Sequence, residues 1–149
     1  MTPSPRMSWK DVAKGAPTTA RVLVVDDTVE VRKSLEKLVR SLGYESRSAA
    51  SAEEADQWLS VERFDAMLLD IDLPRMKGVE FLSWALERDG EMAVIMLTGL
   101  DDPALAIECL EGGARTYLVK PIEANFLRLG LRDALAVRQL LVDRNRLSS

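Results

Sequence analysis

Five polar side chains in this sequence follow four short runs of hydrophobic residues. They are Asp26, Asp27, Asp70, Thr98 and Lys120. Each run has the length of a buried strand, and in an open parallel sheet the residues just past the strands lie together at the carboxyl edge, where ligands bind. We therefore expect three carboxylates, one hydroxyl and one ammonium group to converge on a single pocket. Such a set suits a hard divalent cation and a phosphoryl group.

The three carboxylates of this pocket would repel one another, and a bound Mg²⁺ would relieve that repulsion. We expect Asp27 and Asp70 to be direct ligands and Asp26 to act through water. A backbone carbonyl at Asp72 would complete the set, and Mn²⁺ is an alternative ion. One acid must also be the nucleophile. Asp70 is the candidate because it ends the third strand and faces the groups that follow the other strands.

Strand-like runs and helical periodicity alternate five times along the chain. We expect strands at Arg21–Val25, Tyr44–Ala50, Phe64–Leu69, Ala93–Leu97 and Tyr117–Val119. We expect helices over Asp27–Leu42, from Ser51 to Leu59, over Val79–Arg88, from Asp101 to Gly112–Gly113, and from about Glu123. Because the apolar runs are continuous rather than alternating, the sheet should be parallel and covered by helices on both faces. The predicted fold class is therefore a doubly wound α/β domain.

Composition narrows the functional classes. The chain has 149 residues, 47% of them hydrophobic, and a formal net charge of −4, which argues against a general nucleic-acid or membrane-surface role. No apolar stretch approaches the roughly 20 residues that a membrane helix needs. There is no histidine, which excludes His-based metal sites and Ser-His-Asp catalysis. The single cysteine, Cys109, forbids an intrachain disulfide and fits a cytoplasmic location.

The order of these motifs resembles that of the receiver domain of bacterial response regulators, over about Arg21 to Leu141. The matching stretches are Val24-Val25-Asp26-Asp27, Leu68-Leu69-Asp70-Ile71-Asp72-Leu73-Pro74, Met76-Lys77-Gly78, Met96-Leu97-Thr98-Gly99, Gly113-Ala114 and Tyr117-Leu118-Val119-Lys120-Pro121. Each stretch alone is a weak signal, but all of them in this order, each behind its own strand, are a strong one. The resemblance implies a flavodoxin-like five-stranded sheet with the strand order 2-1-3-4-5.

The resemblance also implies a role for each site residue. Asp70 would be the phosphoacceptor, Lys120 would supply positive charge, and the Thr98 hydroxyl would donate a hydrogen bond to a phosphoryl oxygen. The Lys120–Pro121 peptide bond would be cis. Tyr117 would be the switch residue, which turns inward when Thr98 moves toward the phosphoryl group.

The implied activity is signalling rather than turnover of a substrate. A sensor histidine kinase or a phosphotransfer protein would donate the phosphoryl group, and the surface made by the fourth helix, fifth strand and fifth helix would change in response. The chain would be no enzyme beyond catalysing its own phosphoryl transfer and dephosphorylation. It would act in the cytoplasm, without direct contact with nucleic acid or membrane.

Three other functions fit the motifs less well. A degenerate receiver would lack one of the site residues, and none is missing here. Asp70-Ile71-Asp72 resembles the Asp-x-Asp nucleophile of haloacid-dehalogenase-type phosphatases, but that family places the motif after its first strand. A flavodoxin-like FMN-binding protein would need a hydroxyl- and amide-rich phosphate loop where Asp26-Asp27 stands, and these carboxylates would repel a phosphate.

The two ends of the chain have separate expected roles. We expect a flexible leader over residues 1–19, the receiver over residues 20–137, and an extension of the last helix over residues 138–149. Apolar residues at three- and four-residue steps in that extension favour either a linker to an output domain of a longer regulator or a pairing segment of a phosphorylation-dependent homodimer. A single-domain response regulator is the alternative.

Overall fold

The computed structural model of the protein describes residues 19–99 and 103–148. The strands are β1 (Arg21–Val25), β2 (Glu45–Ala49), β3 (Ala66–Asp70), β4 (Ala93–Thr98) and β5 (Thr116–Val119). The helices are α2 (Val29–Ser41), α3 (Ala52–Val61), α4 (Gly78–Arg88), α5 (Pro103–Glu111) and α6 (Ala124–Ser148). All neighbouring strands pair in parallel, in the order β2-β1-β3-β4-β5. The predicted fold class and strand order are confirmed.

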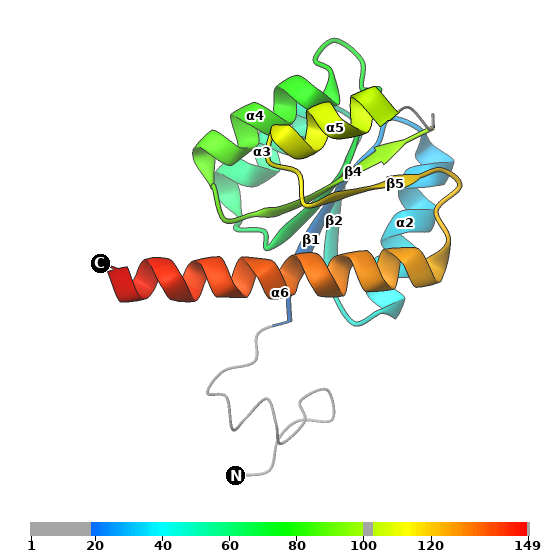
Figure 1. Ribbon diagram of the computed structural model, residues 1–149. Helices are drawn as coiled ribbons and strands as arrows, with labels where there is room; N and C mark the ends of the chain where they lie inside the picture. Colours follow the sequence, from blue (N-terminus) through cyan, green and yellow to red (C-terminus); the bar gives the residue numbers. More distant parts are fainter. Residues whose placement is uncertain (1–18, 100–102, 149) are drawn as a thin grey trace.

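Helices cover both faces of the sheet, with α3, α4 and α5 on one side and α2 and α6 on the other (Figure 1). Successive strand residues therefore enter two different cores. In β3, Met67 and Leu69 pack into the first core with residues such as Phe81 of α4, while Leu68 packs into the second with Leu127 of α6. Because both faces are buried there, the inner strands β1, β3 and β4 are almost continuously apolar, as the sequence indicated, whereas the edge strand β2 is largely polar.

Several element boundaries differ from the prediction by one or two residues. The helix expected from Asp27 begins at Val29, because Thr28 keeps an extended backbone at the N-cap position. Asp70 is the last residue of β3 rather than the residue after it. The predicted start of α3 is confirmed, since the Ser51 hydroxyl accepts a hydrogen bond from the Glu54 N–H at 3.2 Å. The predicted leader, apart from Thr19, and Asp101-Asp102 lie outside the described residues.

Helix α6 continues past the domain's core to Ser148 (Figure 1). Two polar contacts tie its extension to the amino edge of the sheet. Arg138 lies 3.3 Å from the Asp65 carboxylate, and the Asn145 amide donates to Glu91 at 2.5 Å. Within the described ranges, no helix is both apolar and long enough to cross a bilayer.

Candidate functional site

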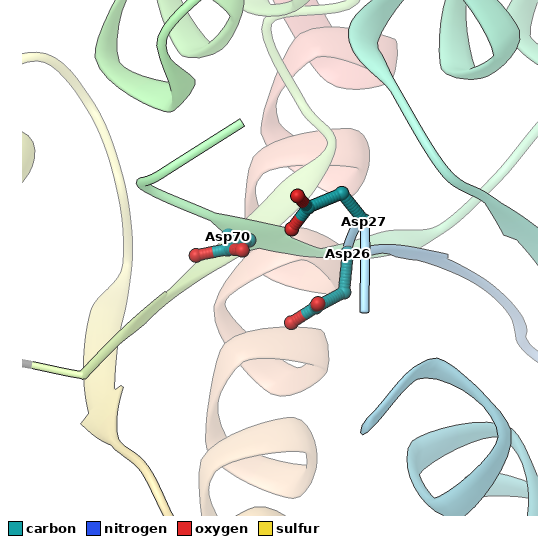
Figure 2. Close-up of side chains that lie close together, drawn as sticks. All are labelled: Asp26, Asp27 and Asp70. Carbon is teal, nitrogen blue, oxygen red and sulfur yellow. The ribbon is translucent and has the colours of Figure 1, made fainter. Parts of the chain in front are cut away.

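The three predicted carboxylates come together at the carboxyl ends of β1 and β3 (Figure 2). The parallel register pairs Val25 with Leu69, so Asp26 and Asp70 follow side by side. One oxygen from each of Asp26, Asp27 and Asp70 lies within 4.8 Å of the others. Asp26 and Asp70 are buried, whereas Asp27 is exposed at the mouth of the cluster.

Lys120 reaches this cluster from the end of β5. Its ammonium group lies 2.6 Å from Asp26 Oδ2 and 3.4 Å from Asp70 Oδ2. Burial by itself would lower the pKa of Lys120, but the contacts with the two carboxylates outweigh burial and hold that pKa above its ordinary value. The side chain is therefore charged at neutral pH. The Lys120–Pro121 peptide bond is cis, the geometry that the resemblance implied.

The ionised form of Asp70 is disfavoured in this site. Burial raises its pKa, and repulsion from Asp26 raises it further. The opposing contributions are a 3.0 Å hydrogen bond from the Asp72 N–H to Asp70 Oδ1 and the charge of Lys120. The net effect is a raised pKa for Asp70, so a cation bound beside this carboxylate would be favoured.

The donor set fits a metal ion on chemical grounds. Carboxylate oxygens are the ligands that hard divalent cations prefer, and Asp27 offers its carboxylate from the open side of the cluster. Asp72 is exposed and contributes its N–H to Asp70, while a metal-ligating role for its carbonyl stays a prediction. The cluster is therefore compatible with a metal site.

Thr98 and Tyr117 occupy the neighbouring strands. The register pairs Asp70 with Leu97, which puts the buried Thr98 one residue beyond, at the same edge. The Thr98 carbonyl accepts a hydrogen bond from the Lys120 N–H at 2.7 Å. Tyr117 lies further back on β5, half-buried against the core under α3, α4 and α5. The structure thus brings together the acids, Thr98 and Lys120, with Tyr117 set behind them.

Sequence reasoning missed Arg32 and did not reveal why Gly78 is needed. Arg32 donates a 2.8 Å hydrogen bond to the backbone carbonyl of Asp26. The sequence signal that could have revealed Arg32 is a cation near a helix N-terminus, where the helix dipole disfavours positive charge.

Gly78 stands in the sequence analysis only as part of a motif. A Cβ at Gly78 would lie 2.7 Å from the Ile71 Cα and would overlap the Asp70 carbonyl, so α4 approaches the end of β3 more closely than a side chain allows.

Known proteins share both the sequence pattern and the fold. The family profile of the response regulator receiver domain matches residues 22–132. The chain is 36% identical over 115 residues to the ycf27 protein of Cyanophora paradoxa, covering 77% of this chain and 48% of that protein. It is 32% identical over 118 residues to the response regulator protein PilR of Pseudomonas aeruginosa, covering 79% of this chain and 26% of PilR. The chain thus spans about half the length, or less, of these curated relatives.

Solved structures agree with this match. A CheY-like response regulator receiver domain protein from Methanospirillum hungatei superposes with a TM-score of 0.77 at 31% identity, covering 82% of this chain and 98% of that one. NtrX from Brucella abortus superposes with a TM-score of 0.83 at 28% identity, covering 87% of this chain and 30% of that one. From the profile match and these similarities, the chain belongs to the response regulator receiver domain family.

Proposed function

We propose that the chain is a signalling receiver that accepts a phosphoryl group on Asp70 and passes the signal to the surface made by α5, β5 and α6. The observation that carries this proposal is the cluster of three carboxylates within 4.8 Å, with the Lys120 ammonium 3.4 Å from Asp70. Phosphoryl transfer requires mainly positioning and charge neutralisation. The cluster provides an oxygen nucleophile, a cation and carboxylate oxygens that could hold a second cation.

The residues have distinct roles in this proposal. An Asp70 carboxylate oxygen forms a bond to phosphorus while the bond from phosphorus to a phosphohistidine nitrogen of the donor breaks, and the imidazole leaves. Lys120 faces the negative charge that gathers on the phosphoryl oxygens, and the Thr98 hydroxyl donates a hydrogen bond to one of them. Mg²⁺, or Mn²⁺ in its place, would be held by Asp27 and Asp70 with Asp26 in support, and would neutralise the carboxylates and the phosphoryl group.

The donor would be a sensor histidine kinase or a phosphotransfer protein acting in the cytoplasm. Any such protein must bring its phosphohistidine to Asp70 and therefore contact the rim of the site. An apolar groove of about 300 Å³ lies there, between α2 and the segment after β5. Its lining includes Val31, Leu35, Leu38 and Ile122, and it shares Lys120 with the acidic cluster. We propose that the chain catalyses no reaction apart from its own phosphoryl transfer and dephosphorylation.

The experiment that tests this function is incubation with acetyl phosphate, followed by measurement of intact mass. The expected result is one added phosphoryl group in the presence of Mg²⁺ and none in the presence of a chelator. Hydroxylamine should remove the group, because it cleaves acyl phosphates. Absence of any added mass under all conditions would contradict the proposal and favour a receiver that acts without phosphorylation.

Mg²⁺ should stabilise the fold through Asp27. A ligand that binds only the native state raises the free energy of unfolding, by about 2.7 kcal/mol at a concentration 100 times Kd. In metal-free buffer we expect Asp27→Ala to be as stable as the wild type or more so, because a repelling carboxylate is gone. With Mg²⁺, the variant should lose the stabilisation that the wild type gains. Urea unfolding at several Mg²⁺ concentrations measures both effects.

A matched control for Asp27→Ala is Asp133→Ala, which removes an exposed acid on α6, away from the site. Its response to Mg²⁺ should equal that of the wild type. If Asp27→Ala responded in the same way, the assignment of Asp27 as a ligand would be wrong.

Thr98 should couple phosphorylation to the signalling surface. Phosphorylation adds about −1.5 to −2 charges and three acceptor oxygens, which Thr98 and Lys120 can move to meet. The departure of Thr98 would open space for Tyr117 to rotate inward. The surface that would change already exposes hydrophobic residues, namely Ile107, Leu110, Val119 and Phe126. We expect Thr98→Ala to bind the phosphomimic beryllofluoride at Asp70 but to transmit little change.

NMR shifts of Leu105–Leu110 and Tyr117, measured on adding beryllofluoride, test this coupling. The wild type should show large shifts at these positions and Thr98→Ala small ones, while the amides next to Asp70 shift in both. Equal shifts at the distant positions in both proteins would refute the role of Thr98.

The extension of α6 should pair with a second copy when the site is occupied. The pairing face consists of Leu140, Leu141 and Leu147 together with Val137, which directly precedes the extension. Its side chains are 69% exposed at Leu140 and 86% exposed at Leu147. The three- and four-residue steps are those of a short coiled coil, and Arg144 in the same row weakens it. We therefore expect beryllofluoride to shift a monomer–dimer equilibrium toward the dimer, as measured by sedimentation.

A version of the chain that ends at Val137 should stay monomeric with and without beryllofluoride. If the full chain also stayed monomeric at high concentration in both states, the pairing idea would be lost. The extension would then be proposed only as a linker to an output domain, and a single-domain regulator would remain the alternative.

A further inference from the structure

Arg32 makes one specific contact that links α2 to the acidic cluster. Its Nη1 atom donates a hydrogen bond to the backbone carbonyl of Asp26 at 2.8 Å. Arg32 lies in the first turn of α2, where the helix dipole disfavours a cation. The bond to Asp26, rather than helix stability, therefore accounts for the half-buried placement of this side chain.

This contact completes the anchoring of Asp26. The Asp26 N–H donates to the Ala49 carbonyl at 3.1 Å, and Asp26 Oδ1 accepts from the Thr28 N–H at 2.9 Å. Asp26 Oδ2 accepts from Lys120 at 2.6 Å. With Arg32 on the carbonyl oxygen, each polar group of Asp26 has its own partner. Asp26 is thus fixed in position, with 0% of its surface exposed.

The next residue, Asp27, depends on that anchoring. The carbonyl of Asp26 and the N–H of Asp27 belong to one planar peptide group, so a bond that fixes the carbonyl also fixes the direction in which the chain enters Asp27. Asp27 is exposed, and within residues 19–99 and 103–148 no hydrogen bond or ion pair is found that holds its carboxylate. Its place in the cluster therefore rests on the backbone.

We propose that Arg32 is a positioning residue for the metal site, which holds the peptide between Asp26 and Asp27 so that the Asp27 carboxylate stays within reach of Asp70. The inference rests on the proposed function, in which Mg²⁺ binds Asp27. It names a residue that touches neither the ion nor the phosphoryl group. Its effect on the ion passes entirely through the backbone and Asp27.

A role of Arg32 through its charge and a role through positioning predict opposite changes in Mg²⁺ affinity when Arg32 is removed. If Arg32 mattered only through its charge, removing a cation near a cation site would tighten Mg²⁺ binding. If Arg32 positions Asp27, removing it loosens a ligand and weakens binding, as the loss of residues that orient metal ligands does. The direction of the change in Kd therefore separates the two roles.

The test is an Mg²⁺ titration of the full chain, monitored by the amide NMR shifts of the residues around the site. Arg32→Met keeps the length and helix propensity of the side chain but removes the donor and the charge. We expect its Kd to rise about tenfold, the lower end of the range for residues that orient metal ligands. Arg32→Lys, which keeps a donor and the charge, should lie between the wild type and Arg32→Met. Lys33→Ala removes a charge from the exposed neighbouring position, and its Kd should be unchanged or slightly lower.

A second background shows whether Arg32 acts through Asp27. In Asp27→Ala, the further change Arg32→Met should leave the residual Mg²⁺ affinity unaltered. An unchanged or lower Kd in Arg32→Met would overturn the proposal. So would a loss of Mg²⁺ affinity on Arg32→Met that is as large in the Asp27→Ala background as in the wild type. If Arg32→Met failed to fold, Arg32→Gln would take its place. Weaker Mg²⁺ binding by that variant would support the proposal, and tighter Mg²⁺ binding would contradict it. A wild type that binds no Mg²⁺ would overturn the proposed function and this inference together, whereas the other outcomes concern Arg32 alone.

Discussion

The Asp70→Asn variant is expected to gain no phosphoryl group from acetyl phosphate and Mg²⁺, while the wild type gains one. An amide is not the anionic oxygen nucleophile that forms an acyl phosphate. We expect that the other two acids cannot replace Asp70. Asp26 has both carboxylate oxygens engaged by Thr28 and Lys120, and Asp27 stands at the exposed side of the cluster. Intact-mass measurement after incubation gives the result directly.

The same substitution should make the metal-free fold more stable. Burial, together with Asp26, raises the pKa of Asp70, which means that the folded state disfavours the ionised form. At neutral pH the carboxylate is ionised in the unfolded chain, so its charge destabilises the fold, and Asn removes that penalty. A higher urea midpoint for Asp70→Asn would show that lost labelling is not lost structure.

The exposed neighbour Asp72 provides the matched control for Asp70. Asp72→Asn removes an acid two residues away and keeps the N–H that bonds Asp70. It should still accept one phosphoryl group. Full labelling of Asp70→Asn, or its absence in Asp72→Asn together with an intact fold, would show that the nucleophile has been assigned to the wrong carboxylate.

The sheet could be predicted from the sequence because both of its faces are buried. A strand such as β4 must then be apolar up to its last residue, and that first polar side chain, Thr98, marks its end. Since all strands are parallel, those ends share one edge, and the site residues could be grouped without any contact being known. Boundaries were less accurate. Thr28 occupies the N-cap position of α2 with an extended backbone, and so the acid pair precedes the helix that was expected to begin at Asp27.

The arrangement within the site could not be predicted in the same way. Asp26 was expected to support the metal through water, and that role stays a prediction. The structure adds that both of its carboxylate oxygens accept hydrogen bonds from the protein, one of them from Lys120. Such pairings depend on side-chain reach across 94 residues of sequence separation, which periodicity does not encode. The contact of Arg32 could not be predicted for a different reason, since its partner, six residues away, is a backbone carbonyl that no side-chain pattern marks.

The sequence marks Gly78 as part of a motif but does not show why glycine is needed there. The Gly78 N–H donates to the Ile71 carbonyl at 2.9 Å, which draws the first turn of α4 against the end of β3. A Cβ there would lie 2.7 Å from the Ile71 Cα and would overlap the Asp70 carbonyl. Both neighbours are backbone atoms, so no change of side-chain rotamer can make room. Glycine is therefore required by the close approach of α4 to the backbone of Asp70 and Ile71.

Gly78→Ala should accordingly lower the free energy of unfolding by about 3 kcal/mol, the upper part of the range for overpacking. The shift of backbone that relieves the clash would also move Asp70, so phosphoryl transfer from acetyl phosphate should slow. Gly90→Ala is the matched control, because its Cβ would meet only the Leu86 carbonyl at 3.5 Å, an ordinary contact. That variant should match the wild type or gain up to about 1 kcal/mol through a less flexible unfolded chain. Urea unfolding of the two variants measures the difference, and equal midpoints would show that α4 can move away from β3 at little cost.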